Sequence, residues 1–198
     1  VEMRAKVPFK QGAFPAFWSL GLPGLTERKN KTYYSEIDFF EVFGSTSLMA
    51  PAMHKWYANG AHTSPNLSQM PGYGKYSFVN YENLPDEFHI YAFEWTTTEI
   101  KMYMDGHCYC TYDISKSYDA DWTKGNMLHG EKDIVVPHDD MDGFHDYIYL
   151  LLQNLLYVSE TSDLDKTVTD DSDLPYEYWV DYIRLYQEPG VGGLIVSK

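Results

Sequence analysis

The sequence predicts an all-β fold in which two antiparallel sheets pack as a sandwich. Short segments rich in aromatic and β-branched residues recur along the chain, and no long amphipathic helical pattern separates them. Several of these segments end at Gly, Pro or Asn, which are turn-forming residues. Many short strands without intervening helices indicate an antiparallel sandwich or barrel, and we expect the sandwich.

Each expected strand has a local signal. The first segment, Glu2–Val7, alternates polar and apolar residues and stops at Pro8, as a half-buried strand does. The pair Asp105-Gly106 separates Ile100–Met104 from His107–Tyr112 and is typical of a two-residue hairpin turn. The other expected strands are Tyr33–Phe43, Phe88–Trp95, Tyr147–Leu156 and Tyr178–Tyr186.

The 198 residues suit one domain with a substantial core, and no repeat or linker divides them. Three longer segments are expected to be surface loops, which either carry specificity or simply connect strands: Gly21–Lys31, Gly60–Tyr76 and Asp113–Asp146. The acidic stretch Ser159–Asp173 lacks the Gly and terminal Glu of an EF-hand loop, so we expect a solvated loop.

The composition excludes some classes of partner. The net charge of -14 argues against nucleic acid and anionic membranes and fits a neutral or weakly charged substrate better. No apolar run approaches the roughly 18 residues needed to span a bilayer. Cys108 and Cys110 would share one face of a strand without the geometry for a mutual disulfide, so we expect free thiols.

One expected strand carries three acids, Glu36, Asp38 and Glu41. In a regular strand Glu41 points to the face opposite Glu36 and Asp38, toward the core, where an unpaired carboxylate is costly. One extra residue, a β-bulge at Phe39-Phe40, would bring Glu41 to their face. The two glutamates would then suit the nucleophile and the acid/base of a glycosidase, with Asp38 between them. Surface acids on an exposed strand are the alternative.

These residues resemble glycoside hydrolase family 16, which includes laminarinases, lichenases, agarases and carrageenases. The run from Glu36 to Glu41 is similar to the family's bulged Glu-x-Asp-x-x-Glu signature. The resemblance implies a curved, concanavalin-like jelly-roll sandwich with an open concave substrate cleft. Other segments that resemble the family are Gly12–Leu20, Phe88–Trp95, Met102–Gly106 and Tyr178–Tyr186.

The family's functional residues are carried over position by position. By this resemblance Glu36 is the nucleophile, Glu41 the acid/base and Asp38 the assisting acid. No metal ligand is among the site residues, and we expect catalysis to require no cofactor.

The expected substrate-binding residues lie on three segments. Trp18 and Tyr34 match sugar-contacting aromatic positions of the family, although Trp18 in the core is the alternative. His54 and Trp56 share one face of the next strand, where they could reach the sugar beside Glu36, and an ordinary surface role is the alternative for His54. Only one of Gln153 and Asn154 can face the cleft, and we expect Asn154.

The chain differs from the family at its beginning. Relatives usually carry several tens of residues, including a strand or two, before the segment equivalent to Val1–Lys6. We therefore expect one catalytic domain over residues 1–198 that lacks the usual N-terminal strands, with 190–198 as a flexible tail or tag. A structural calcium ion, which in relatives draws ligands from that earlier segment and from near Asp181, is an expectation on the resemblance alone.

The resemblance implies an endo-acting, retaining enzyme that cleaves internal β-1,3 or mixed β-1,3/1,4 linkages of a glucan. One alternative is a β-galactan-type endo-hydrolase acting on agar, carrageenan or host glycans with the same strand. Another is a carbohydrate-binding sandwich without turnover. We expect a monomer that acts on a polysaccharide outside the cytoplasm, secreted, extracellular or periplasmic, with no nucleic acid or membrane partner.

Overall fold

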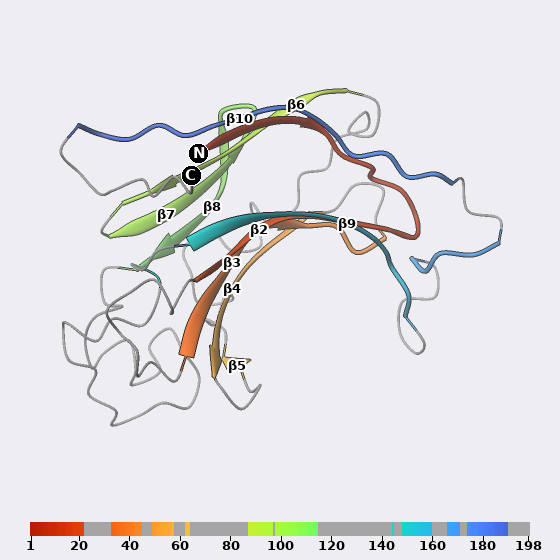
Figure 1. Ribbon diagram of the computed structural model, residues 1–198, viewed down its shortest axis with the longest axis horizontal. Helices are drawn as coiled ribbons and strands as arrows, with labels where there is room; N and C mark the ends of the chain where they lie inside the picture. The colour runs from red at the N-terminus through yellow and green to blue at the C-terminus, as the bar shows by residue number, and fades with distance from the viewer. Residues whose placement is uncertain are drawn as a thin grey trace, which may run out of the picture.

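The computed structural model describes residues 1–21, 33–44, 49–57, 62–63, 87–96, 98–114, 144, 148–159, 166–170 and 174–189 of the 198-residue chain. Within these ranges the regular structure consists of β-strands in two five-stranded sheets, and neighbouring strands run antiparallel. Figure 1 shows the two sheets as stacked layers, so the predicted sandwich is confirmed. The described part of the chain holds no helix able to cross a membrane.

The first sheet has the strand order β10-β1-β6-β7-β8, and the second has the order β5-β4-β3-β2-β9. The second sheet is curved, with its concave face turned away from the first sheet (Figure 1). The strands of the first sheet are β1 (Glu2–Lys6), β6 (His89–Trp95), β7 (Glu99–Met104), β8 (His107–Asp113) and β10 (Trp179–Arg184). Those of the second sheet are β2 (Ala13–Gly21), β3 (Tyr33–Glu41), β4 (Ala50–Tyr57), β5 (His62–Thr63) and β9 (Ile148–Leu156).

Aromatic rings fill the middle of the sandwich. Phe39 of β3 stacks on Phe93 of β6, with ring centroids 3.7 Å apart and ring planes 6° apart. Phe17 of β2 packs against both rings, and Phe40 of β3 packs against Tyr91 of β6. All five rings are buried, and each such pair contributes about 0.5–1.5 kcal/mol beyond the area it buries. The inner face of β3 is therefore held firmly against the first sheet.

The hairpin between β7 and β8 turns at Asp105 and Gly106, as the sequence predicts. Both residues have left-handed backbones, with φ of 49° and 79°, as the favoured two-residue hairpin turn requires. The carboxylate of Asp105 also accepts hydrogen bonds from the Ile90 amide at 2.8 Å and from the His89 ring at 2.6 Å. The turn is thus tied to the start of β6.

Strand β2 was not predicted as a strand by the sequence pattern. It lies between β3 and β9 and pairs with both along its length. Pro15, the third of its nine residues, argues against a central strand, because proline has no N–H to donate. Its carbonyl nevertheless accepts a hydrogen bond from the Val42 amide at 3.0 Å, so the ladder continues past the proline.

The expected loops are described only in part. Gly21 ends β2, Asp113 ends β8 and His62–Thr63 form β5, so these residues belong to strands rather than loops. Apart from Ile114 and Phe144, both buried, the other residues of the three expected loops lie outside the described ranges.

The sandwich is open at the edge formed by β9 and β10. Leu152 of β9 pairs with fully buried Phe17, yet its side chain is 45% exposed. Ile183 of β10 pairs with fully buried Met3 and is 41% exposed. Inner-face apolar side chains at this edge therefore meet solvent, while those of the central strands do not.

Gly44, just beyond β3, packs against Lys166, which belongs to the acidic stretch expected to be solvated. Its φ is 62°, and a Cβ placed on it would lie 2.0 Å from the Lys166 carbonyl oxygen. Gly12, at the start of β2, donates its amide to the same oxygen at 2.8 Å. Part of this stretch thus packs on the ends of β2 and β3 instead of standing free in solvent.

Gly44→Ala is expected to lower the free energy of unfolding for two reasons. An alanine in the left-handed backbone conformation costs about 1–2 kcal/mol, and overpacking of its Cβ costs about 1–3 kcal/mol more. Gly106→Ala is the matched control, because its φ is 79° but a Cβ there would meet nothing within 4 Å. Thermal or urea unfolding of both variants checks the prediction. Equal losses in the two variants would contradict it.

Candidate active site

The predicted bulge in β3 is confirmed by the pairing of this strand with both neighbours. Along β4 the partners run from Asp38↔Ala52 to Glu41↔Ala50, so three steps on β3 match two on β4. Along β2 the pairing steps from Asp38 directly to Phe40 and skips Phe39. One extra residue is therefore inserted at Phe39-Phe40.

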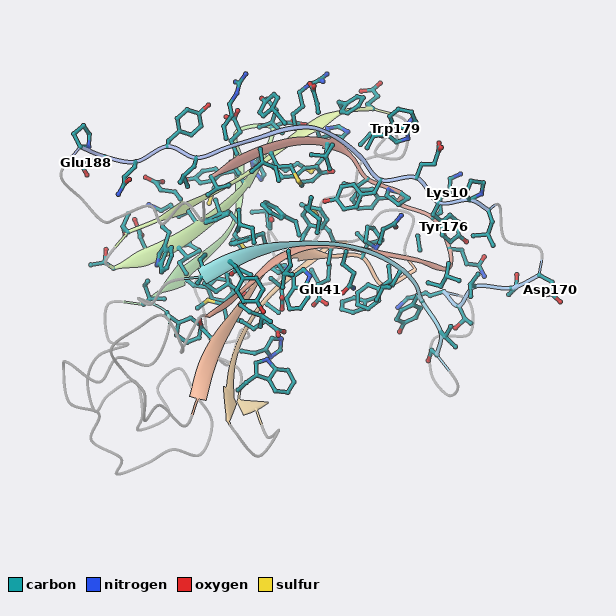
Figure 2. The ribbon with its side chains drawn as sticks, viewed as in Figure 1. Lys10, Glu41, Asp170, Tyr176, Trp179 and Glu188 are labelled. Carbon is teal, nitrogen blue, oxygen red and sulfur yellow. The ribbon has the colours of Figure 1, made fainter. Side chains whose placement is uncertain are left out.

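The bulge places the three acids of β3 on one face. Phe39 and Phe40 are 2% and 0% exposed and both point into the core, whereas a regular strand would turn one of them outward. Glu41 then lies on the side of the second sheet that faces away from the first (Figure 2). The charges of Glu36, Asp38 and Glu41 act on one another, which the pKa of Glu41 reflects. Three carboxyl groups thus share one region of the concave face.

Burial and mutual repulsion favour the protonated forms of these acids. Burial, with the negative charge of Asp38 adding to it, raises the pKa of Glu36 to about 7. Burial, with the charges of Asp38 and Glu36 adding to it, raises the pKa of Glu41 to about 8. The pKa of Asp38, whose side chain is only 3% exposed, is raised by burial as well. The cluster therefore binds protons near neutral pH, where ordinary carboxyl groups are ionised.

Two residues of β4 counteract this effect at Glu36. The indole N–H of Trp56 donates to Glu36 Oε2 at 2.9 Å. His54 Nε2 lies 3.9 Å from Glu36 Oε1 and 3.4 Å from Asp38 Oδ2. Both contacts lower the pKa of Glu36 and so favour its ionised form, although burial outweighs them. Trp56, predicted to bind sugar, is thus observed as a partner of a catalytic candidate.

His54 is held among negative charges. Burial alone would lower its pKa, but the close approach of Asp38 and the charges of Glu36 and Glu41 outweigh burial and raise the pKa of His54. When the neighbouring carboxyl groups are ionised, their negative charges therefore favour the protonated, imidazolium form of His54. The strand pairing sets His54 directly opposite Glu36, and the predicted contact of His54 with the sugar stays a prediction.

The strand pairing also locates the other expected binding residues. Trp18 of β2 is directly opposite Asp38, so its side chain is on the concave face and is only partly buried. The backbone of Tyr34 pairs with Trp56 in the same row of residues, and its side chain lies outside the described part of the structure. Sugar binding by these residues stays a prediction.

Asn154 does not face the concave side, so its predicted orientation is wrong. It pairs with Pro15, which shares the inner face with Phe17, and its amide donates to the Tyr176 carbonyl at 3.0 Å. Gln153 pairs with Ala16, which is opposite Glu41. Because side chains alternate along a strand, Gln153 is the amide on the concave face that carries Glu41. The pairing of β9 with β2 decides this, and no signal within Gln153-Asn154 itself could.

Two places in the described residues bear on metal binding. Ligand atoms of Glu36, Asp38 and His54 all lie within 4.8 Å of one another, close enough to hold a cation. Asp181, near which a structural calcium was expected, instead accepts a hydrogen bond from the Arg4 guanidinium at 2.6 Å. The calcium ion stays a prediction.

Comparisons with known proteins agree with this arrangement. The chain is 26% identical over 192 residues to a glucan endo-1,3-β-glucosidase A1 of Niallia circulans. The matched region covers 95% of this chain and 24% of that protein. A solved structure from work on endo-acting O-glycanases of human gut microbiota members that initiate mucin breakdown matches with a TM-score of 0.58 and 22% identity. A family 16 protein of the Bacteroides ovatus mixed-linkage glucan locus, solved with a bound product, matches with a TM-score of 0.57 and 22% identity.

The two structural matches cover 91% of this chain, and they cover 54% and 65% of the solved chains. The chain thus spans about a quarter of the Niallia circulans protein and less than two thirds of either solved chain. The family model described as glycosyl hydrolases family 16 matches residues 1–127, a range that includes the bulged carboxylate strand. On this match, the chain belongs to glycosyl hydrolase family 16.

Proposed function

We propose that this domain is an endo-acting, retaining glycoside hydrolase that cleaves internal β-1,3 or mixed β-1,3/1,4 linkages of a glucan. The observation that carries the proposal is the bulge at Phe39-Phe40, which sets Glu36 and Glu41 on one face. Burial and the charge of Asp38 raise the pKa of both glutamates, but the Trp56 hydrogen bond lowers the pKa of Glu36, which is raised to about 7 against about 8 for Glu41. Two carboxyl groups whose surroundings differ in this way suit a nucleophile and an acid.

The reaction follows from these two protonation states. Ionised Glu36 attacks the anomeric carbon while Glu41 gives its proton to the departing glycosidic oxygen, which leaves a glycosyl ester on Glu36. Glu41, now a carboxylate, takes a proton from water as the water attacks the same carbon and releases Glu36. Each step inverts the anomeric carbon, so the product retains the β configuration. The negative charge of Asp38 helps to keep Glu41 protonated before the first step.

The relatives support a glucan as substrate. The Niallia circulans protein is named for endo-1,3-β-glucan cleavage, and the Bacteroides ovatus protein belongs to a locus for mixed-linkage glucan. The net charge of -14 also favours an uncharged polymer over a sulfated one, because like charges repel.

The deciding experiment is a panel of laminarin, mixed-linkage β-glucan, agarose, carrageenan and mucin glycans assayed for new reducing ends. We expect the fastest release from one of the two glucans, with internal cleavage seen as a rapid fall in chain length. Nuclear magnetic resonance of the first products should show the β anomer. Preference for a galactan or a host glycan would overturn the glucan assignment, and first products in the α form would overturn the retaining mechanism.

His54→Asn is expected to move the acidic limb of the kcat/KM profile upward by about one pH unit. The charge of His54 lowers the pKa of Glu36, and loss of an opposite charge at this distance typically shifts a pKa by about one unit or more. Glu36 must be ionised to attack, so the variant would need a higher pH to become active. His107→Asn, an exposed histidine on β8, is the control and should leave the limb in place. A downward shift, or none, would contradict the prediction.

We also propose that catalysis needs no metal ion or other cofactor. A cation bound by Glu36, Asp38 and His54 would occupy the oxygen that Glu36 needs for attack. Activity should therefore survive dialysis against EDTA, and loss of activity restored by a divalent metal would argue against the proposal.

We further propose that the domain acts as a secreted monomer. Size-exclusion chromatography with light scattering can check the oligomeric state, and fractionation of the producing cells can check the location.

A further inference from the structure

The bulge in β3 interrupts the regular strand pairing at Phe39. Phe39 is the residue skipped in the pairing with β2, and Phe39 and Phe40 together oppose a single position of β4. The side chain of Phe39 is 2% exposed, so this part of the backbone lies inside the sandwich. A buried carbonyl without a donor destabilises the conformation that exposes it. The bulge therefore needs a partner from elsewhere in the fold.

Tyr109 of β8 supplies that partner from the opposite sheet. Its hydroxyl donates to the Phe39 carbonyl oxygen at 2.5 Å, across 70 residues of sequence. Its side chain is 2% exposed, so water does not compete for the bond. Burial raises the pKa of the Tyr109 hydroxyl well above its ordinary value, and the group stays a donor at any pH at which the protein functions.

Strand β8 is itself bulged at this residue. Along β7, Met102 pairs with Cys110 but Tyr103 pairs with Cys108, so Tyr109 is the extra residue. Cys108 and Cys110 are free thiols, as predicted, but this extra residue turns them to opposite faces rather than the one face that was expected. The bulge in the first sheet thus points its extra side chain at the bulge in the second.

We propose that Tyr109 is a positioning residue that holds the β3 bulge and thereby keeps the Glu41 carboxyl group on the face of Glu36. The proposal rests on the function proposed above. Phe93 fixes the ring of Phe39 by stacking, and Tyr109 fixes the carbonyl of the same residue. Without the hydroxyl the ladder can relax toward regular pairing, which turns Glu41 away from the concave face.

The test compares Tyr109→Phe with the matched control Tyr112→Phe. Tyr112 is on the same strand and is fully buried, but its hydroxyl makes no hydrogen bond to the β3 backbone. Each variant is assayed on the preferred polysaccharide and on a dinitrophenyl glycoside. The dinitrophenolate leaves without a proton from Glu41, so its release reports attack by Glu36 alone.

We expect Tyr109→Phe to lose about tenfold in kcat/KM on the polysaccharide, the size of one lost buried hydrogen bond, and less than threefold in dinitrophenolate release. Tyr112→Phe should keep the wild-type ratio of the two rates. This ratio does not depend on how much of the variant is folded, so partial unfolding cannot imitate the result. In a Glu41→Gln background, Tyr109→Phe should cause no further loss on the polysaccharide.

The possible outcomes distinguish failure of the proposed role of Tyr109 from failure of the proposed hydrolase function. An active wild type with equal losses on both substrates in Tyr109→Phe would overturn the role of Tyr109 alone, as would a full additional loss in the Glu41→Gln background. A wild type that cleaves no glycan would overturn the proposed function, and the role of Tyr109 with it.

Discussion

Glu36→Gln is expected to abolish hydrolysis of the preferred polysaccharide while binding of that polysaccharide remains. Glutamine has nearly the shape of glutamate and can still accept the Trp56 N–H bond seen at 2.9 Å. An amide oxygen carries no charge with which to form the glycosyl ester, so the covalent route is closed. The loss should exceed the factor of about 10²–10⁴ that general acid–base catalysis contributes. Reducing-end release and isothermal titration calorimetry measure the two quantities.

Glu94→Gln is the matched control for this variant. Glu94 is an exposed glutamate on β6, in the first sheet. It should keep both activity and binding. Turnover by Glu36→Gln at the wild-type rate would remove Glu36 from the nucleophile role and would favour the reading of the domain as a binding module.

Glu41→Gln is expected to reduce kcat on the polysaccharide by about 10²–10⁴-fold, because the leaving oxygen no longer receives a proton. Formation of the glycosyl ester from a dinitrophenyl glycoside should be spared, so a burst of dinitrophenolate should precede slow turnover. Added azide should restore turnover, since it attacks the anomeric carbon of the ester without base assistance and displaces the Glu36 carboxylate. The expected product is the β-glycosyl azide. An α-glycosyl azide, or no rescue, would contradict the assigned pair.

The pH profile gives a second measurement on the same residue. With the pKa of Glu36 raised to about 7 and that of Glu41 to about 8, wild-type kcat/KM should be bell-shaped with its limbs near these values. The two limbs belong to the coupled pair. Glu41→Gln should lose the basic limb and keep the acidic one.

The same shift links the stability of the protein to pH. A carboxyl group whose pKa is raised on folding stabilises the fold below its unfolded pKa, and this contribution is lost as pH rises through the folded value. For Glu41 the window runs from about 4.5 to about 8. Glu41→Gln should therefore unfold at a higher temperature than wild type at pH 8, and the difference should shrink toward pH 4.5. A variant that is less stable at pH 8 would show that Glu41 is not buried as described.

The bulge in β3 shows which features of the site could be predicted from the local sequence and which could not. Three acids on an apolar strand, with Glu41 out of phase, leave three arrangements: a buried charge, an inserted residue, or surface acids on an exposed strand. The cost of burying an unpaired carboxylate argues against the first, and the structure contains the second. That Phe39 and Phe40 would both turn inward was not visible in the pattern, because their shared direction depends on the rings of Phe93 and Tyr91 in the other sheet.

The orientation of Asn154 was predicted wrongly because the local sequence holds no signal that separates it from Gln153. Gln153 and Asn154 are chemically alike and adjacent, so a shift of one residue exchanges their faces. Only the pairing of β9 with β2 resolves that choice. The strand β2 was itself missed because Pro15 breaks the pattern of a central strand, so the partner that decides the pairing was missing from the prediction.

By itself, the sequence determined the features that depend on neighbours in the chain: the alternation that makes strands, the Asp105-Gly106 turn, and the extra residue that Glu41 requires if it is to share the face of Glu36 and Asp38. The tertiary structure alone decided what distant segments control. It brought Trp56 and His54 to Glu36, turned Gln153 rather than Asn154 to the concave face, and set Tyr109 on the Phe39 carbonyl. Local patterns report the conformation of neighbours in the chain, whereas these contacts depend on strand pairing and sheet packing across many residues.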